Sequence, residues 1–169
     1  MIRIALGGGG TAEQSMPLDL VFAAWIGSRG RLLYIPNALG TDTETVRRAS
    51  AWINETFGAI SDITIHTRTR LDQITPADLR TYDGVYIGGG NTYELLSQMV
   101  RSGLLPTLRT AIRDGLCAYG GSAGAAVLGA DIGTVSHLDE NTAGITDTRA
   151  ADVVGGYAVW VHYTDTDDR

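Results

Sequence analysis

Short apolar runs alternate with helical patterns along the first 130 residues of the chain. Three of these runs end in glycine clusters, namely Ile2–Leu6 before Gly7–Gly10, Val85–Ile87 before Gly88–Gly90, and Leu116–Tyr119 before Gly120–Gly124. A short β-rich run that ends in glycines and then opens a helix is typical of a strand–turn–helix unit. The pattern therefore predicts three such units.

The intervening segments continue the alternation. Arg31–Ile35 and Ile63–His66 read as two further strands. Thr41 and Glu44 have the spacing of a capping box, with apolar residues at helical intervals behind them, and predict a helix start. Further helix starts are expected at Thr75-Pro76, Asn91 and Pro106.

After about Ala130 the pattern weakens. Residues 131–156 read as irregular, and Tyr157–Tyr163 reads as a last strand. Neither a repeat nor a linker interrupts the chain, so we expect one domain over residues 1–169. Strands alternating with helices predict an α/β, doubly wound, mostly parallel sheet with helices on both faces. Ligands of such sheets bind beyond the carboxyl ends of the strands, where all three glycine clusters fall.

Composition excludes several chemistries. All 13 basic residues are arginine, which removes a P-loop lysine, a Schiff-base lysine and a serine–lysine dyad. The net charge of −6 argues against a nucleic-acid partner. No apolar run approaches the roughly 18–20 residues of a membrane span, and the start lacks the layout of a signal peptide. The scattered histidines and the single Cys117 argue against a metal site. We expect a cytoplasmic protein without a cofactor.

The third glycine cluster is the sharpest signal for chemistry. Gly120–Gly124 matches G-x-S-x-G, with an apolar run before it and small residues after it. In a nucleophile elbow this pattern exposes the serine hydroxyl above the sheet, so Ser122 is the candidate nucleophile. The amide of Ala123 would stabilise an oxyanion, and Gly89 or Gly88 would supply the second donor. The alternative is a tight structural turn in which Ser122 only caps a helix.

A serine nucleophile needs a base, and the sequence offers three histidines. His162 lies at the end of the last expected strand, where a base would face the elbow, whereas His66 reads as a surface residue and His137 lies in the irregular segment. With Asp139 between them, Ser122 and His162 follow the chain order of α/β-hydrolases.

The first glycine cluster allows another interpretation. Gly7–Ala12 can be aligned with G-x-G-x-x-A, a dinucleotide-binding pattern. A ribose-binding acid is then expected after the second strand, where the chain has Pro36-Asn37 instead. Nucleotide binding is therefore a minor alternative.

The chain contains two motifs, Gly88–Leu96 (GGGNTYELL) and Gly120–Ala125 (GGSAGA), followed by the apolar–His–aromatic segment Val161–Tyr163. Together these motifs resemble those of peptidase family S51, which includes aspartyl dipeptidases and cyanophycinases. The resemblance runs from Ile2 to about Tyr163.

The resemblance implies a fold like that of class I glutamine amidotransferases, with serine in place of their cysteine. It implies Ser122 as nucleophile, His162 as general base, and an oxyanion hole from Ala123 and the Gly88–Gly90 turn. The third member of the site is Asp139, its neighbour Glu140, or a later glutamate that this chain lacks.

The sequence departs from the family in two ways. It ends seven residues after His162, whereas the family continues, which suggests a fragment or a shortened member that borrows surface from a second subunit as a homo-oligomer. Aspartate-specific members are expected to hold the substrate carboxylate with an arginine, and the candidates here are Arg169 and Arg149. Asn91 is a further candidate substrate contact.

These expectations combine into one hypothesis, a serine peptidase that hydrolyses short peptides, with an aspartate-specific dipeptidase as its narrower form. The main alternative is a non-catalytic binding or assembly module on the same fold. A glutaminase-like amidotransferase is a third reading, which Cys117 disfavours because it lies five residues before the elbow serine.

Overall fold

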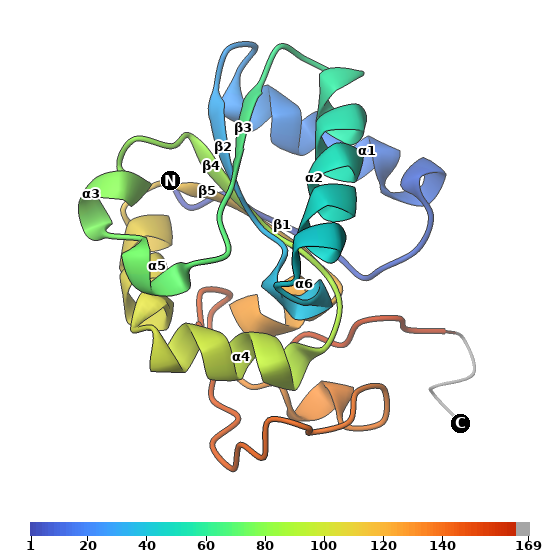
Figure 1. Ribbon diagram of the computed structural model, residues 1–169, viewed down its shortest axis with the longest axis vertical. Helices are drawn as coiled ribbons and strands as arrows, with labels where there is room; N and C mark the ends of the chain where they lie inside the picture. The colour runs from blue at the N-terminus through green and yellow to red at the C-terminus, as the bar shows by residue number, and fades with distance from the viewer. Residues whose placement is uncertain (165–169) are drawn as a thin grey trace.

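The computed structural model describes residues 1–164, which form a five-stranded sheet with helices on both faces (Figure 1). All pairings are parallel, in the order β1-β5-β4-β2-β3. The strands are β1 (Ile4–Gly7), β2 (Arg31–Ile35), β3 (Thr64–Thr67), β4 (Gly84–Ile87) and β5 (Cys117–Gly121). The predicted α/β class and parallel sheet are confirmed.

Two helical layers cover the sheet. One face packs against α1 (Ala12–Ile26) and α2 (Thr43–Gly58) through an aromatic core that contains Phe22, Phe57 and Tyr119. The other face is mainly aliphatic and is covered by α4 (Thr92–Arg101), α5 (Leu104–Arg113) and α6 (Ala123–Leu128), with the short α3 (Pro76–Leu79) against α5. No helix among the described residues is long and apolar enough to cross a membrane.

The strand order explains why three separated glycine clusters can form one site. Strand β5 lies between β1 and β4, and the clusters follow these three strands. Because parallel strands end at the same edge of a sheet, the clusters lie next to one another, with the Ser122 turn in the middle. The alternation of strands and helices in the sequence does not specify this order.

The helices begin where the sequence predicts them, except for α2 and α5. Asn91 caps α4 as predicted, with its side chain accepting a hydrogen bond from the Glu94 amide. The capping box of Thr41 and Glu44 is wrong, because Asp42 caps α2 and accepts from the Thr45 amide at 3.0 Å. Glu44 instead pairs with Arg47 on the helix surface. Helix α5 begins at Leu104, two residues before the expected Pro106.

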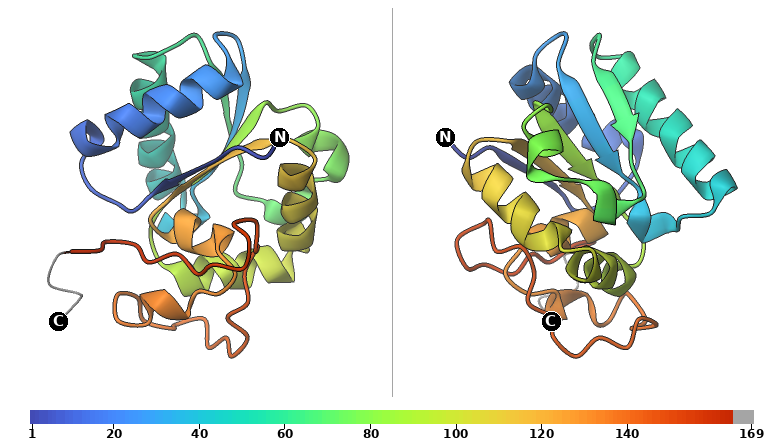
Figure 2. Two further views of the ribbon diagram at one scale, coloured as in Figure 1. Left: turned by 180° about the vertical axis from the view of Figure 1, so that it is seen from behind. Right: turned by 60° about the vertical axis from the view of Figure 1, so that its left-hand side comes forward.

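The C-terminal part of the described chain is irregular from about residue 130, as predicted, but its expected last strand is wrong. Tyr157–Tyr163 forms no ladder, because its backbone bonds go to different segments: the Tyr157 carbonyl accepts from the Ala130 amide, and the His162 amide donates to the Gly8 carbonyl at 2.8 Å. Figure 2 shows this orange-to-red segment along the carboxyl edge of the sheet, beside α4 and α6.

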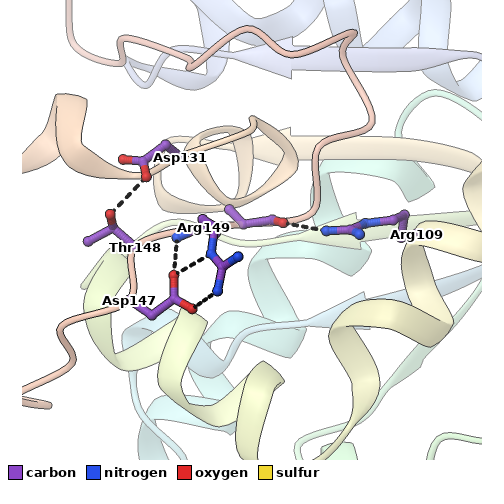
Figure 3. Close-up of polar contacts among 6 residues, drawn as sticks. Arg109, Asp131, Asp147, Thr148 and Arg149 are labelled. Carbon is purple, nitrogen blue, oxygen red and sulfur yellow. Dashed lines mark hydrogen bonds and ion pairs between the residues drawn. The ribbon is translucent and has the colours of Figure 1, made fainter.

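Side chains from the helical layer anchor this irregular segment. Arg109 of α5 donates from its guanidinium to the carbonyls of Ala150 and Ala151. Figure 3 shows the Arg109 side chain reaching the segment that follows Arg149. The Thr148 hydroxyl donates to Asp131 at 2.8 Å, which ties the two ends of the loop together. Hydrogen bonds from a charged donor to carbonyls are stronger than neutral ones, so an irregular segment can keep one path across the edge of the sheet.

Candidate active site

Ser122 lies at a strained turn between β5 and α6. Its backbone has φ 49° and ψ −111°, an unfavourable region for a residue with a side chain. The adjoining glycines allow the turn to be this tight: a methyl group on Gly124 would lie 2.1 Å from the Ile87 carbonyl oxygen, and one on Gly120 would lie 2.5 Å from the Ala125 amide nitrogen. These features are those of a nucleophile elbow.

The structure brings Ser122 and His162 together. Ser122 Oγ and His162 Nε2 are 2.8 Å apart, within hydrogen-bonding distance, although 40 residues separate them in the chain. His162 also has a positive φ of 53°, so both partners have unusual backbone conformations. A histidine in this position can accept the serine proton when Nε2 is unprotonated.

The first glycine cluster positions the histidine. The Gly8 carbonyl accepts the His162 amide, and the imidazole lies directly over Gly9. A methyl group on Gly9 would lie 2.2 Å from His162 Cε1, so only glycine leaves room for the ring, and the φ of 106° at Gly9 also favours glycine. Sequence reasoning missed this role. The signal was present as a glycine run at the end of β1, but the neighbour of β1 in the sheet was unknown.

Gly89 and Ala123, the predicted oxyanion donors, both lie next to the serine. A methyl group on Gly89 would lie 3.2 Å from Ser122 Cβ, which shows how closely the Gly88–Gly90 turn approaches the elbow. Within the described part of the chain, no hydrogen bond uses the Gly89 or the Ala123 amide. The Gly88 amide donates to the Ile35 carbonyl at 2.9 Å, so Gly88 is unsuited to the predicted oxyanion role.

Asp139 does not lie where the sequence hypothesis needs it. Its Oδ2 accepts the backbone amide of Thr92, the first residue of α4, at 2.8 Å. Across residues 1–164, no hydrogen bond or ion pair joins His162 to a carboxylate, neither that of Asp139 nor that of Glu140. The predicted Asp139–His162 contact is therefore absent, because the helix terminus holds this carboxylate.

Asn91, predicted as a substrate contact, is occupied by the fold. Its oxygen caps α4 and its amide nitrogen donates to the Glu140 carbonyl at 2.9 Å. Arg149 pairs with Asp147 at 2.6 Å on an exposed loop and lowers the pKa of that carboxyl to about 2 through the hydrogen bond (Figure 3). Arg169 lies outside the described residues.

The remaining candidates lie away from the elbow. His66 of β3 is half-buried and contacts the Tyr82 ring, and His137 contacts the exposed Trp160. Cys117 is buried at the start of β5, five residues before Ser122. The part of the chain that the structure describes contains no group of three or more His, Cys, Asp or Glu that could hold a metal ion.

Comparisons with known proteins agree on one family. The model of peptidase family S51 matches residues 4–169. Peptidase E of Streptomyces coelicolor is 38% identical over 109 residues, and peptidase E of Shewanella sp. strain W3-18-1 is 40% identical over 60 residues. These matches cover 63% and 36% of this chain, but only 41% and 25% of the relatives, so the chain spans well under two thirds of their length.

Two solved structures share the fold. A candidate peptidase E from Listeria monocytogenes EGD-e superposes with a TM-score of 0.72 at 20% identity, covering 92% of this chain and 77% of its own. A peptidase from an acI-B1 Actinobacterium superposes with a TM-score of 0.69 at 17% identity, covering 96% of this chain and 69% of its own. Both superpositions show that the α/β fold is shared.

Proposed function

The chain belongs to peptidase family S51, and from that premise we propose that it hydrolyses short peptides by serine catalysis. One observation carries the proposal: the 2.8 Å contact between Ser122 Oγ and His162 Nε2 at a strained elbow. If Ser122 only capped a helix, its hydroxyl would be expected to bond to the helix backbone rather than to a histidine ring. The Ser122 side chain also makes no capping hydrogen bond to α6.

The proposed reaction follows from this geometry. Ser122 Oγ attacks the peptide carbonyl carbon while His162 Nε2 takes the hydroxyl proton. The amides of Gly89 and Ala123 hold the negative oxygen of the tetrahedral intermediate. His162 then gives the proton to the departing amine, and water hydrolyses the acyl-enzyme with His162 again as base.

In this mechanism backbone atoms, rather than a carboxylate, position His162. Its amide is held by the Gly8 carbonyl, and its ring is held by contact with Gly9. Asp139 instead links the loop after residue 130 to the start of α4, because its carboxylate accepts the Thr92 amide. On this basis Ser122 and His162 form a dyad within the described residues.

The variant Asp139→Asn distinguishes a Ser–His dyad from a Ser–His–Asp triad. Asparagine can still accept the Thr92 amide, so we expect a loss of only about 0.5–1 kcal/mol from the weaker interaction with the helix terminus. Activity should stay within about tenfold of the wild type, whereas losing the aspartate of a serine triad costs about 10⁴-fold in kcat. Urea unfolding and dipeptide hydrolysis measure the two effects.

Glu140→Gln is the matched control, because it removes the same charge one residue later from an exposed side chain. Within residues 1–164 only the backbone carbonyl of Glu140 forms hydrogen bonds, with the Asn91 side chain and the Thr142 amide, so stability and activity should both be unchanged. A loss of about 10³-fold or more in kcat for Asp139→Asn, with unchanged stability, would restore Asp139 as the orienting acid.

We do not extend the proposal to aspartate specificity. A substrate carboxylate needs a cationic partner, and none of the arginines in residues 1–164 lines the pocket beside Ser122. Arg149, the sequence candidate that the structure describes, is already paired with Asp147.

A fluorophosphonate probe tests the proposal against the non-catalytic binding module. An activated serine forms a covalent phosphonyl ester, which peptide mass spectrometry locates. We expect labelling at Ser122 and none at the exposed Ser136, which serves as an internal control. An unlabelled Ser122, together with no hydrolysis of dipeptides, would favour the binding module instead.

A further inference from the structure

The pocket beside Ser122 has walls that the proposed reaction does not use. It encloses about 280 Å³ on the face of the sheet that α1 and α2 cover. Its walls are the turn between β1 and α1, the first turn of α1, and three aromatic side chains, those of Trp52, Tyr86 and Tyr119. Ser122 and Gly89 form part of the same lining, so a substrate group held there belongs to a residue that flanks the scissile bond.

A buried carboxylate lies behind this wall. Asp19, one helical turn after Ser15 on α1, is only 3% exposed. The Ser15 hydroxyl, which lines the pocket, donates to Asp19 Oδ2 at 2.9 Å. The Ala12 carbonyl is a second acceptor for this hydroxyl, at 3.2 Å. Because both acceptors belong to α1, the hydroxyl proton points into the helix and oxygen lone pairs of Ser15 are left for the pocket. Ser15 therefore offers an acceptor rather than a donor to a bound group.

Tyr86 and Tyr119 add two hydroxyl groups to the lining of the pocket. Their rings stack with centroids 4.4 Å apart, and their hydroxyls lie at the top of the sheet, where a methyl group on Gly7 or Gly121 would come within 3.1 Å of them. Burial raises the pKa of both tyrosines, and the nearby carboxylate of Asp19 adds to the rise. Both hydroxyls thus stay protonated.

Charge and aromatic surface favour a cation in this pocket. No arginine of the described chain lines it, and Asp19 supplies a negative charge behind its wall. Trp52 is 41% exposed, with its ring centroid 5.9 Å from that of Tyr86, and aromatic faces attract ammonium and guanidinium groups. A carboxylate in the same place would meet oxygen lone pairs and a like charge.

We propose that this pocket selects peptides with a basic side chain next to the scissile bond. The oxygen atoms of Ser15 and Tyr119, and the carboxylate of Asp19 behind them, would stabilise the positive charge of that side chain. The inference rests on the proposed peptidase function. The depth of Asp19 behind Ser15 favours lysine or arginine, which carry their charge at the end of a long flexible stem.

Lysine and norleucine dipeptides test the charge alone, because norleucine has a similar stem without the ammonium group. The substrates are Lys-Ala, Nle-Ala and Asp-Ala, with Ala-Lys, Ala-Nle and Ala-Asp covering the other side of the scissile bond. We expect kcat/KM for the lysine peptide of one series to exceed that of its norleucine partner at least tenfold. Equal rates in both series, or a preference for aspartate, would overturn the proposal.

Asp19→Asn should lower this lysine-to-norleucine ratio at least tenfold, because it removes the charge and keeps the shape. Glu55→Gln is the matched control, with the same charge change on an exposed face of α2, and should leave the ratio unchanged. If Asp19→Asn does not fold, as judged by circular dichroism, Ser15→Ala removes the acceptor hydroxyl instead and should lower the ratio several-fold. A ratio that survives the folded variant refutes the role of Asp19.

A binding measurement separates the pocket from the catalysis. Calorimetry of the same lysine and norleucine peptides with Ser122→Ala requires no reaction. At least tenfold tighter binding of the lysine peptide supports the pocket, even if the wild type hydrolyses nothing and the proposed function fails. Equal affinities refute the pocket, even if peptides are hydrolysed.

Discussion

Ser122→Ala is expected to lower kcat for dipeptide hydrolysis by at least about 10⁴-fold, because no other group can form the acyl-enzyme. The residual rate would come from binding and from the amides of Gly89 and Ala123. Alanine keeps the same backbone conformation at φ 49°, so the strain of the turn is unchanged. The variant loses one partly exposed hydrogen bond to His162, about 1 kcal/mol or less. The large loss of rate should therefore come without a matching loss of stability.

The control for this experiment is Ser136→Ala, a serine on an exposed turn after residue 130. It should keep the wild-type rate and stability. Measurements of kcat with the most active dipeptide, and of unfolding by urea, are needed for both variants. Hydrolysis by purified Ser122→Ala within tenfold of the wild-type rate would rule out Ser122 as the nucleophile.

The parts of the fold that were predictable from the sequence are those set by local patterns. β2 has the predicted bounds, and Asn91 and Thr75 cap the helices expected of them. The order of the strands depends on long-range packing, which no local pattern records. Even locally, Thr41 and Asp42 are both suitable N-cap residues one position apart, and in the structure Asp42 caps the helix.

The geometry of the candidate site was predictable where a recognisable turn marks the residue. Ser122 followed from the glycine pattern, and His162 from its position in the chain and the resemblance to the family. Asp139 could not be assigned reliably, because the irregular segment contains several carboxylates and nothing in the sequence says that one accepts the Thr92 amide. The pocket was missed for a related reason, since nothing in the sequence distinguishes Asp19 from the other polar residues of α1 as the buried one.

Gly9→Ala should lower activity about 10²-fold or more without replacing either member of the proposed dyad. The new methyl group would lie 2.2 Å from His162 Cε1 and 2.7 Å from Nδ1 and Nε2, so the ring must leave its place on the serine. Displacing a catalytic group by about 1 Å can cost about 10²-fold, so we expect kcat/KM to fall at least that far. The φ of 106° adds a strain of about 1–3 kcal/mol, visible as a lower midpoint in urea.

Gly8→Ala supplies the matched control, because a methyl group at Gly8 would come no closer than 3.9 Å to the His162 amide nitrogen and its φ is not in the left-handed region. It should keep kcat/KM within about threefold, since both the ring and the backbone hydrogen bond to His162 are undisturbed. Loss in Gly9→Ala alone would show that the first glycine cluster serves the histidine. Equal losses in both variants would point instead to a general requirement for a flexible turn, and wild-type activity in Gly9→Ala would refute the backbone positioning of His162.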